Sequence, residues 1–395
     1  AAVRKNKTSV YAVAPYSTRG LRKLRGTLLP TVPGDEADAL TGLRVGARGA
    51  VGAAAAARLA EGGVILVGER LATSAGGLAA AAELASATGA TLAWVPRRAG
   101  ERGALDAGAI GALLPGGRPF SDPAARAQVA ELWDVDVDAL PTVSGRDTAG
   151  IIEAARSGWV GAVVIGGVDL DDLGLPEVRS ALSKAFVVSL ELRESSVTAV
   201  ADVILPVAAQ AEKAGTYLNW EGRERPFEAA LASNAMSDHR VLDMLAAELG
   251  VFLETRTQEQ IRAQLDALGT WTGARTVVVP AHSLPSSDRG DVILATWPTL
   301  LDQGRMQDGE PFLAGTAPKT VARVGPALAD RLDVQDGDVV TVAGPGGSVS
   351  VPVVVTDDMV DAVVWLPTNS LGCAVRSTLG ADAGSRVTVT KGGPE

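Results

Sequence analysis

The chain has 395 residues, enough for roughly two or three domains with a large hydrophobic core. Its apolar residues are mostly Ala, Val and Leu, aromatic residues are few, and no apolar run reaches the ~18 residues that a membrane-spanning helix needs. A net charge of −10 disfavours nucleic-acid binding, because a phosphate backbone is bound by a concentrated basic surface. We therefore expect a layered α/β protein with no nucleic-acid partner and no direct membrane insertion.

Cysteine and histidine are too scarce to form metal centres. Cys373 is the only cysteine, and an iron–sulfur cluster needs several thiolates, so this chain cannot supply one. His239 and His282 have no ligand-like spacing, and both are expected at the surface or at a helix cap. We predict no metal site here. Because the chain starts at Ala1 without Met or a signal-peptide pattern, we expect it to be part of a longer polypeptide.

The N-terminal part alternates short apolar runs with helical patterns. Residues 10–14 predict a strand, residues 28–34 an extended connection, and Asp35 the cap of the following helix. Residues 64–67 are a continuous apolar run, typical of a strand buried on both faces. The pair Gly76-Gly77 precedes a helix but fits neither GxGxxG nor a Walker loop, so close backbone packing is the expected reason for it.

Three further strands are expected between helices, at residues 160–165, at residues 186–190 and after Asp202. The carboxyl ends of these three successive strands are polar, which predicts a parallel sheet of the dinucleotide-binding kind. At the end of the first, the turn from Gly166 to Asp169 could place a carboxylate at a ribose. A plain turn between a strand and a helix is the favoured interpretation.

The stretch ADVILPVAAQAEKAGTYLNWEGRER, residues 201–225, has unusually dense polar residues after a strand that Pro206 ends. They include Glu212, Gly215, Asn219, Glu221 and Arg223. Open α/β sheets bind ligands at the carboxyl edge of their strands, so a ligand loop is one interpretation. The other is an ordered surface loop in which Gly215 and Gly222 supply positive φ angles. The residues alone leave both open.

The C-terminal part changes character. Amphipathic helices are expected at residues 238–249 and 257–268, and a boundary near residue 285. Strands follow at residues 292–296, 339–343, 349–355, 363–366 and 387–390, with one helix at residues 326–332. This pattern predicts a small β-barrel.

Three segments resemble the molybdopterin oxidoreductase family. ADVILP followed by AEKAGTYLNWEGR is similar to the ADxxLP…AExxGTxxNxEGR segment of that family. Residues 327–359 resemble its C-terminal dinucleotide-binding barrel, and residues 10–40 the segment after its first α/β strand. The resemblance implies an α/β fold with parallel-sheet, dinucleotide-binding-like domains at residues 1–145 and 146–285. A six-stranded, double-psi type β-barrel would follow at residues 286–395.

Within the family the sequence looks most like the large iron–sulfur protein, the G subunit, of bacterial NADH-quinone oxidoreductase, respiratory complex I, of an actinobacterial type. That resemblance implies [2Fe-2S] and [4Fe-4S] clusters in an N-terminal portion outside this chain, and electron transfer from NADH to quinone by the whole enzyme. It implies the flavoprotein and neighbouring iron–sulfur subunits of the peripheral arm as partners, on the cytoplasmic side of the plasma membrane. The present portion is then expected to be a non-catalytic scaffold with molybdopterin absent.

Two departures from the family pattern support the scaffold hypothesis. Active members carry Asp-Pro-Arg after the opening strand, where this chain has Ala14-Pro15-Tyr16, and the aromatic–lysine pair of their closing loop has no equivalent after Pro367. The resemblance then makes six residues a vestigial seat for the pterin dinucleotide, with charges that join the α/β region to the barrel: Glu212, Gly215, Asn219, Glu221, Arg223 and Asn369. The alternative is the cofactor-binding half of an active formate dehydrogenase or nitrate reductase, in which the polar residues among them would hydrogen-bond the cofactor.

Overall fold

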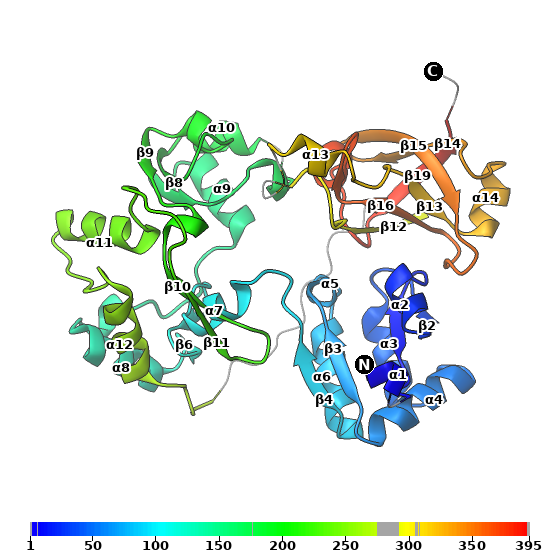
Figure 1. Cartoon of the computed structure of the whole chain (residues 1–395), viewed down its shortest axis with the longest axis horizontal. Coiled ribbons are helices and arrows are strands. Elements are labelled where there is room, and N and C mark those ends of the chain that lie inside the picture. Colours follow the sequence, from blue (N-terminus) through cyan, green and yellow to red (C-terminus); the bar gives the residue numbers. More distant parts are fainter. Residues whose placement is uncertain are drawn as a thin grey trace. The chain divides into compact units, whose positions relative to one another are not determined.

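The chain forms two compact units (Figure 1). The computed structural model describes residues 2–5, 7–175, 177–274, 292–304, 307 and 309–392. Unit 1 consists of Ala1–Val95, Leu173–Pro176 and Val278–Glu395, and unit 2 of Pro96–Asp172 and Glu177–Val277. The expected boundary at residue 285 falls outside the described residues and the one at residue 145 falls within unit 2, so the three-domain division stays a prediction. No helix in the described part of the chain is long and apolar enough to cross a membrane.

The N-terminal part of unit 1, blue to cyan in Figure 1, contains two separate pairs of parallel strands, β1 with β2 and β3 with β4. Its elements are α1 (Ala2–Lys5), β1 (Tyr11–Ala14), α2 (Arg19–Lys23), β2 (Thr27–Pro30), α3 (Glu36–Arg44), α4 (Gly49–Ala60), β3 (Val64–Val67), α5 (Glu69–Ala72), α6 (Gly77–Thr88) and β4 (Thr91–Trp94). The connection expected at residues 28–34 is therefore partly a strand. A four-residue strand that contains proline carries too weak an apolar pattern to be recognised alone.

One hydrophobic core supports both strand pairs. Leu40 and Leu43 of α3 and Leu84 of α6 are buried in it, and Tyr11 and Ile65 of the strands pack against it. A Cβ on Gly77 would lie 2.8 Å from Leu71, which confirms close packing as the reason for this glycine. Gly76 instead has φ +71°, in the left-handed region that favours glycine.

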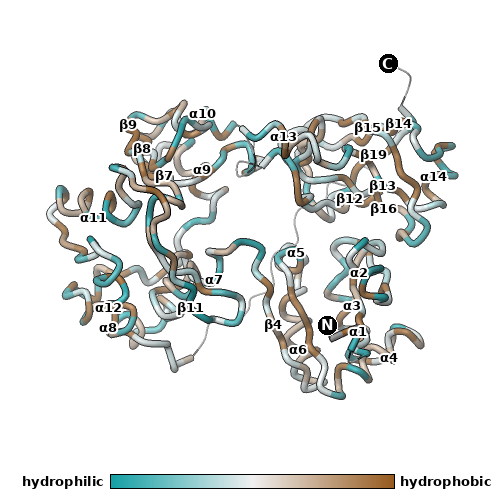
Figure 2. Tube along the Cα trace, in the orientation of Figure 1, coloured by the Kyte–Doolittle hydropathy of each residue, from teal (hydrophilic) through white to brown (hydrophobic). Residues whose placement is uncertain are grey.

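The prediction that residues 64–67 are buried on both faces is wrong. Val64 is 55% exposed and Leu66 is 64% exposed, although the whole run is coloured as hydrophobic in Figure 2. Their side chains point away from the core, and within the described residues no layer covers that face of β3. A continuous apolar run predicts a strand with two apolar faces, but only the tertiary structure shows whether both are covered.

The C-terminal part of unit 1, yellow to red in Figure 1, contains a closed six-stranded barrel in the order β12-β16-β13-β15-β14-β19. Its elements are β12 (Val292–Trp297), α13 (Pro311–Ala314), β13 (Ala322–Val324), α14 (Pro326–Leu332), β14 (Val339–Gly344), β15 (Gly347–Val355), β16 (Val363–Pro367), β17 (Asn369–Ser370), β18 (Cys373–Ala374), a π-helical turn (Val375–Leu379) and β19 (Arg386–Lys391). The barrel and its helix are confirmed. The three-residue β13 completes the ring and is the strand that the sequence pattern did not locate.

Strands β12 and β16 are buried on both faces. Leu294 and Leu366 point into the barrel core, while Ala295, Val363 and Trp365 belong to a second apolar cluster around Tyr16, which follows β1. The Val360 N–H also donates to the Pro15 C=O at 2.8 Å. The barrel is therefore packed directly onto the end of β1 within unit 1.

Unit 2 contains the predicted parallel sheet, in the order β7-β8-β9. Its elements are α7 (Glu101–Asp106), β5 (Leu113–Leu114), β6 (Arg118–Pro119), α8 (Pro123–Trp133), a 3₁₀ turn (Val137–Ala139), α9 (Thr148–Arg156), β7 (Ala162–Gly166), a 3₁₀ turn (Asp171–Leu173), α10 (Val178–Leu182), β8 (Phe186–Glu191), 3₁₀ turns (Thr198–Val200 and Gln210–Glu212), β9 (Val203–Pro206), β10 (Gly215–Leu218), β11 (Glu224–Phe227), α11 (Asp238–Glu248) and α12 (Gln258–Leu268).

The two C-terminal helices of unit 2 match the expected ranges within a residue. Thr257 caps α12 by accepting a hydrogen bond from the Gln260 N–H. In α11 only Val241 is buried, whereas Leu242 is 42% exposed and Leu249, just beyond the helix, is 75% exposed. The helical spacing therefore predicted the helix correctly but overestimated its buried face.

Candidate functional site

The polar stretch of residues 210–227 folds into a 3₁₀ turn and an antiparallel hairpin of β10 and β11. Gly215 pairs with Phe227 and Leu218 pairs with Glu224, so five residues, 219–223, form the connection. The rings of Tyr217 and Phe227 stack at 5.0 Å between centroids. The sequence left open a ligand loop or an ordered surface loop, and the segment is ordered. The contacts of its polar side chains show whether it could also hold a ligand.

Asn219 organises the hairpin connection. Its side-chain Oδ1 accepts hydrogen bonds from the N–H of Glu221 at 3.0 Å and of Arg223 at 2.8 Å, and its Nδ2 donates to Glu221 Oε2 at 3.3 Å. Arg223 pairs with Glu221 at 3.3 Å. Local side-chain to backbone bonds of this kind are typical of Asn in turns. Asn219, Glu221 and Arg223 thus contact one another, and both charged side chains are exposed to solvent.

The two glycines of the segment act differently from one another. Gly222 has φ +79°, in the left-handed region, as expected. Gly215 lies in β10 and does not have a positive φ, so that part of the prediction is wrong. Its Cβ, if added, would lie 2.6 Å from the Phe227 ring. Gly215 is therefore required by the close approach of an aromatic ring rather than by a turn.

The remaining charges of the segment also bond locally. Glu212 Oε2 accepts from the Ala209 N–H at 2.9 Å, and Lys213 pairs with Asp238 at the start of α11. Glu224 pairs with Arg262 of α12 at 2.5 Å. These contacts lie within unit 2, and the expected link from this segment to the barrel stays a prediction.

Asn369, the sixth residue of the predicted seat, lies in unit 1. It belongs to β17, which pairs with β18, and its backbone C=O accepts from the Gln303 N–H at 2.9 Å. In β18 the Cys373 thiol is 2% exposed and faces the Pro367 C=O at 3.5 Å. Burial raises the pKa of this thiol to about 11, so it stays protonated near neutral pH.

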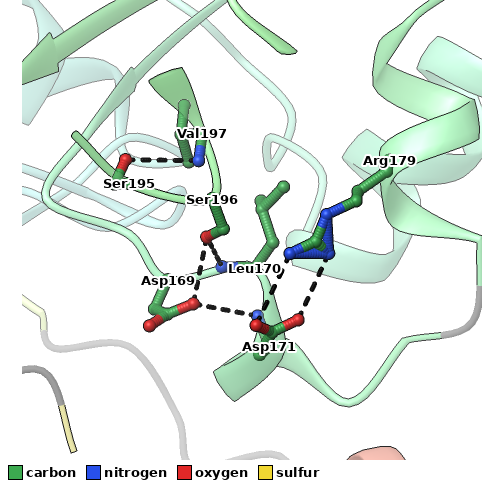
Figure 3. Close-up of polar contacts among 7 residues, drawn as sticks. All are labelled: Asp169, Leu170, Asp171, Arg179, Ser195, Ser196 and Val197. Carbon is green, nitrogen blue, oxygen red and sulfur yellow. Dashed lines mark hydrogen bonds and ion pairs between the residues drawn. The ribbon is translucent and has the colours of Figure 1, made fainter. Parts of the chain in front are cut away.

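The turn after β7 is a structural turn (Figure 3). Asp169 Oδ1 accepts from Ser196 Oγ at 3.0 Å and from the Asp171 N–H at 3.1 Å. Ser196 Oγ in turn accepts from the Leu170 N–H at 3.0 Å, and Arg179 pairs with Asp171 at 3.2 Å. This network joins the segments that follow β7 and β8, and Asp169 holds the turn in place. It is consistent with a plain turn between a strand and a helix, the interpretation favoured over a ribose contact.

An aromatic cluster that the sequence reasoning missed lies at the end of β1. The Tyr16 ring stacks on Trp297 at 5.3 Å and meets Trp365 edge-on at 6.3 Å. The guanidinium of Arg70 lies 4.4 Å from the centre of the Trp297 ring, and that of Arg323 lies 6.0 Å from the Tyr16 ring. The chain is poor in aromatic residues, so a Trp on each of two barrel strands was the sequence signal that could have indicated this cluster.

The position of this cluster bears on the cofactor question. Tyr16 stands where active family members are expected to carry a guanidinium, and it is 7% exposed. Desolvation by burial raises its pKa to about 12, against the opposing effect of Arg323 and Arg70. The phenol is therefore neutral, and its ring packs the α/β part onto the barrel. Tyr16 therefore serves apolar packing at the strand end and supplies no positive charge to a phosphate.

The residues of the predicted seat do not form a site prepared for a dinucleotide either, because their polar atoms already bond within the chain. Asn219 and Glu212 use side-chain oxygens on backbone N–H groups of their own segment, and Arg223 uses its guanidinium on Glu221. Within the described ranges no three His, Cys, Asp or Glu side chains are grouped to hold a metal ion. His239 lies in the first turn of α11, is half-buried and contacts Ser237 Oγ at 3.2 Å, so it neither caps the helix nor lies fully at the surface. His282 lies outside the described residues.

Two family models match the sequence. The molybdopterin oxidoreductase model matches residues 51–245, and the molydopterin dinucleotide binding domain model matches residues 303–391, which include most of the barrel. The chain belongs to the molybdopterin oxidoreductase family. The resemblance stated from the motifs is thereby confirmed, as is the α/β fold followed by a six-stranded barrel.

Within this family the chain is similar to the G subunit of NADH-quinone oxidoreductase. The G subunit of Mycobacterium bovis is 49% identical, with 99% of this chain and 48% of the relative aligned, and that of Streptomyces coelicolor is 50% identical, with 98% and 47% aligned. The chain thus spans about half the length of these curated relatives.

More distant relatives include an assimilatory nitrate reductase of Haloferax mediterranei, 29% identical over 64% of this chain and 43% of the relative. Among solved structures, acetylene hydratase from Pelobacter acetylenicus is 14% identical, with a TM-score of 0.43 and coverage of 64% of this chain and 42% of that one. The nitrate reductase match is far weaker than those to the G subunits, so it does not favour the alternative of an active molybdoenzyme.

Proposed function

We propose that this chain is the molybdopterin-oxidoreductase-like half of the iron–sulfur G subunit of an NADH-quinone oxidoreductase, and that it acts there as a scaffold. The observation that carries the proposal is the 49–50% identity to G subunits over at least 98% of the chain. The whole enzyme would transfer electrons from NADH to quinone. The [2Fe-2S] and [4Fe-4S] clusters would lie in the other half of the polypeptide, because one buried cysteine cannot ligate them.

The scaffold role is supported by how the polar residues are used. The side chains of Asn219, Glu221 and Arg223 bond within their own hairpin. Tyr16 packs against two barrel tryptophans at the position of the expected guanidinium. We therefore assign Glu212, Gly215, Asn219, Glu221, Arg223 and Asn369 to a vestigial pterin site with no molybdenum. The partners would be the flavoprotein and adjacent iron–sulfur subunits, in a peripheral arm on the cytoplasmic side of the membrane.

The test is elemental and pterin analysis of the complex purified from the source organism. We expect iron at the stoichiometry of the clusters, together with molybdenum, tungsten and oxidised pterin each below about a tenth of an equivalent per polypeptide. A formate dehydrogenase prepared in parallel is the positive control. About one equivalent of molybdenum or tungsten with pterin would overturn the scaffold role, and absence of the flavoprotein from the preparation would overturn the assignment to complex I.

A further inference from the structure

Unit 1 contains a cavity of about 920 Å³ between its two strand pairs. Residues 7–15, with the whole of β1, and residues 61–68, with the whole of β3, form part of its lining. The lining also includes core residues of α3, α4 and α6, among them Leu40, Leu43, Ala55, Ala81 and Leu84. The cavity therefore combines two strands with the apolar surface of the helices that cover the sheet.

The backbone of β1 has one paired edge and one open edge. The Thr27 N–H donates to the Val10 C=O at 2.8 Å, and the Thr31 N–H donates to the Ala14 C=O at 3.1 Å, so even-numbered residues bond β2. In a parallel ladder alternate residues direct their N–H and C=O groups to opposite edges. The backbone groups of Tyr11 and Val13 consequently point away from β2.

Strand β3 has the complementary arrangement. The Thr91 N–H donates to the Gly63 C=O at 3.0 Å, and the Val95 N–H donates to the Val67 C=O at 2.8 Å, so odd-numbered residues bond β4. The backbone groups of Val64 and Leu66 point away from β4. Among the described residues, β3 pairs with β4 alone and β1 with β2 alone.

Both strands run in the same direction. Tyr16, directly after β1, stacks on Trp297 at 5.3 Å, and Arg70, shortly after β3, lies 4.4 Å from the same ring. The carboxyl ends of β1 and β3 therefore meet at one point of the barrel. Two open edges of parallel strands thus flank one cavity over a shared apolar core.

Open edges of this kind can pair with a further strand, because an unpaired edge is a template for another strand. A strand between β1 and β3 would satisfy both edges and cover the apolar lining, turning two pairs into one continuous parallel sheet. Alternate apolar side chains on that strand would lie over the core of Leu43 and Leu84.

The relatives show where such a strand could come from. The G subunit of Mycobacterium bovis aligns with 99% of this chain but with only 48% of its own length, so about as much polypeptide again lies outside the match. A strand on the same polypeptide is held at high effective concentration and needs no separate partner.

We propose that a strand of about four residues, from the half of the G-subunit polypeptide outside this chain, inserts between β1 and β3 and runs parallel to both. The proposal rests on the proposed membership in the G subunit. It makes the α/β part of unit 1 a joint structure of both halves of the polypeptide, with the open edges at Tyr11, Val13, Val64 and Leu66 as the contact.

The first test is residue-resolved amide hydrogen exchange on the full-length polypeptide. The Val13 and Leu66 amides would bond the inserted strand, whereas those of Ala12 and Ile65 face β2 and β4. We expect the exchange rates of the two sets to agree within about tenfold after correction for intrinsic rates. Exchange of Val13 and Leu66 a thousandfold faster than their neighbours, or fast exchange at all four positions, would overturn the proposal.

The second test identifies the occupant by cross-linking. A photoreactive p-benzoylphenylalanine replaces Tyr11, whose ring is similar and which lines the cavity, and replaces Val45 as a control that is 65% exposed and not part of the lining. We expect the probe at position 11, and not at position 45, to link to a peptide from the other half of the same polypeptide. Linkage to a second copy, or protected amides without any peptide linkage, would assign the cavity to another occupant and overturn the proposal.

Neither test requires the other proteins of the complex. A chain that failed to assemble with a flavoprotein could still give the intrachain product, and an assembled complex could still lack it. The failure of this inference and the failure of the proposed function are therefore distinguishable.

Discussion

At the scale of single residues, several aromatic and polar side chains make their contacts within the chain. Tyr16 forms ring contacts with Trp297 and Trp365, and Asp169 accepts hydrogen bonds that close a turn. Arg118, 2% exposed, donates to the C=O groups of Pro115 and Gly269 at 3.1 and 2.9 Å. A buried guanidinium with such partners is satisfied internally and holds the loops of unit 2 together.

The raised pKa of Tyr16 predicts a specific loss of stability at alkaline pH. The folded pKa of about 12 lies above the ordinary value of 10.0, so the unfolded state loses the proton first. The contribution is fully present below pH 10 and is lost as the pH rises from 10 towards 12. We expect Tyr16→Phe to reduce the dependence of the unfolding free energy on pH in this window.

Ultraviolet titration at 295 nm measures the ionisation of the tyrosine phenols directly. The chain has three tyrosines, so removing one of them gives a resolvable difference. The difference between wild type and Tyr16→Phe should titrate near pH 12. A difference spectrum that titrates at pH 10 would contradict the burial of this phenol.

At the scale of elements, the hairpin of β10 and β11 shows how a ligand-like motif becomes a structural one. Its two glycines serve a tight turn and a close ring contact, its Asn caps the turn, and its charges pair with neighbours. The sequence indicated an ordered polar segment at the end of a strand. It could not distinguish bonds within the segment from bonds to a ligand, because both use the same side chains.

Substitution of the hairpin glycines should therefore reduce stability and assembly without changing the chemistry. Gly222→Val forces a β-branched residue to φ +79°, at a cost of at least about 1–2 kcal/mol, and Gly215→Val meets the Phe227 ring, at about 1–3 kcal/mol. Gly161→Val is the matched control, because a Cβ there meets no atom within 4 Å and φ is not positive.

The measurements are the urea midpoint of each variant and the NADH-quinone turnover per assembled complex. Lower midpoints and lower yields for Gly215→Val and Gly222→Val, with turnover per complex unchanged, are the expected result. Normal assembly with lost turnover would instead indicate a direct role in the reaction.

At the scale of the whole chain, both units expose apolar side chains on parallel strands, a class of sheet usually covered on both faces. Val64 and Leu66 of β3 in unit 1 are 55% and 64% exposed, and Val164 of β7 and Ile204 of β9 in unit 2 are 53% and 48% exposed. Because the chain spans about half of its relatives, we infer that the other half contributes cover to these faces.

This inference predicts a difference in the binding of the dye ANS, which reports accessible apolar surface. The 395-residue chain should bind several-fold more dye per mole than the full-length polypeptide. Leu66→Gln is expected to lower the dye signal of the chain alone. The control is Leu371→Gln, at a 77% exposed position outside the parallel strands. Equal dye binding by the chain and the full-length polypeptide would contradict the idea that the other half covers these faces.

The sequence by itself determined the kinds of elements, the parallel sheet of β7, β8 and β9, the barrel and the family, because periodicity and motifs are local properties of the chain. It also indicated the scaffold hypothesis through Ala14-Pro15-Tyr16. Only the tertiary structure decided that Tyr16 packs against barrel tryptophans, that Gly215 accommodates a ring, and that β1 and β3 leave open edges around one cavity. Each of these depends on which elements pack or pair with one another in space, which a local pattern does not encode.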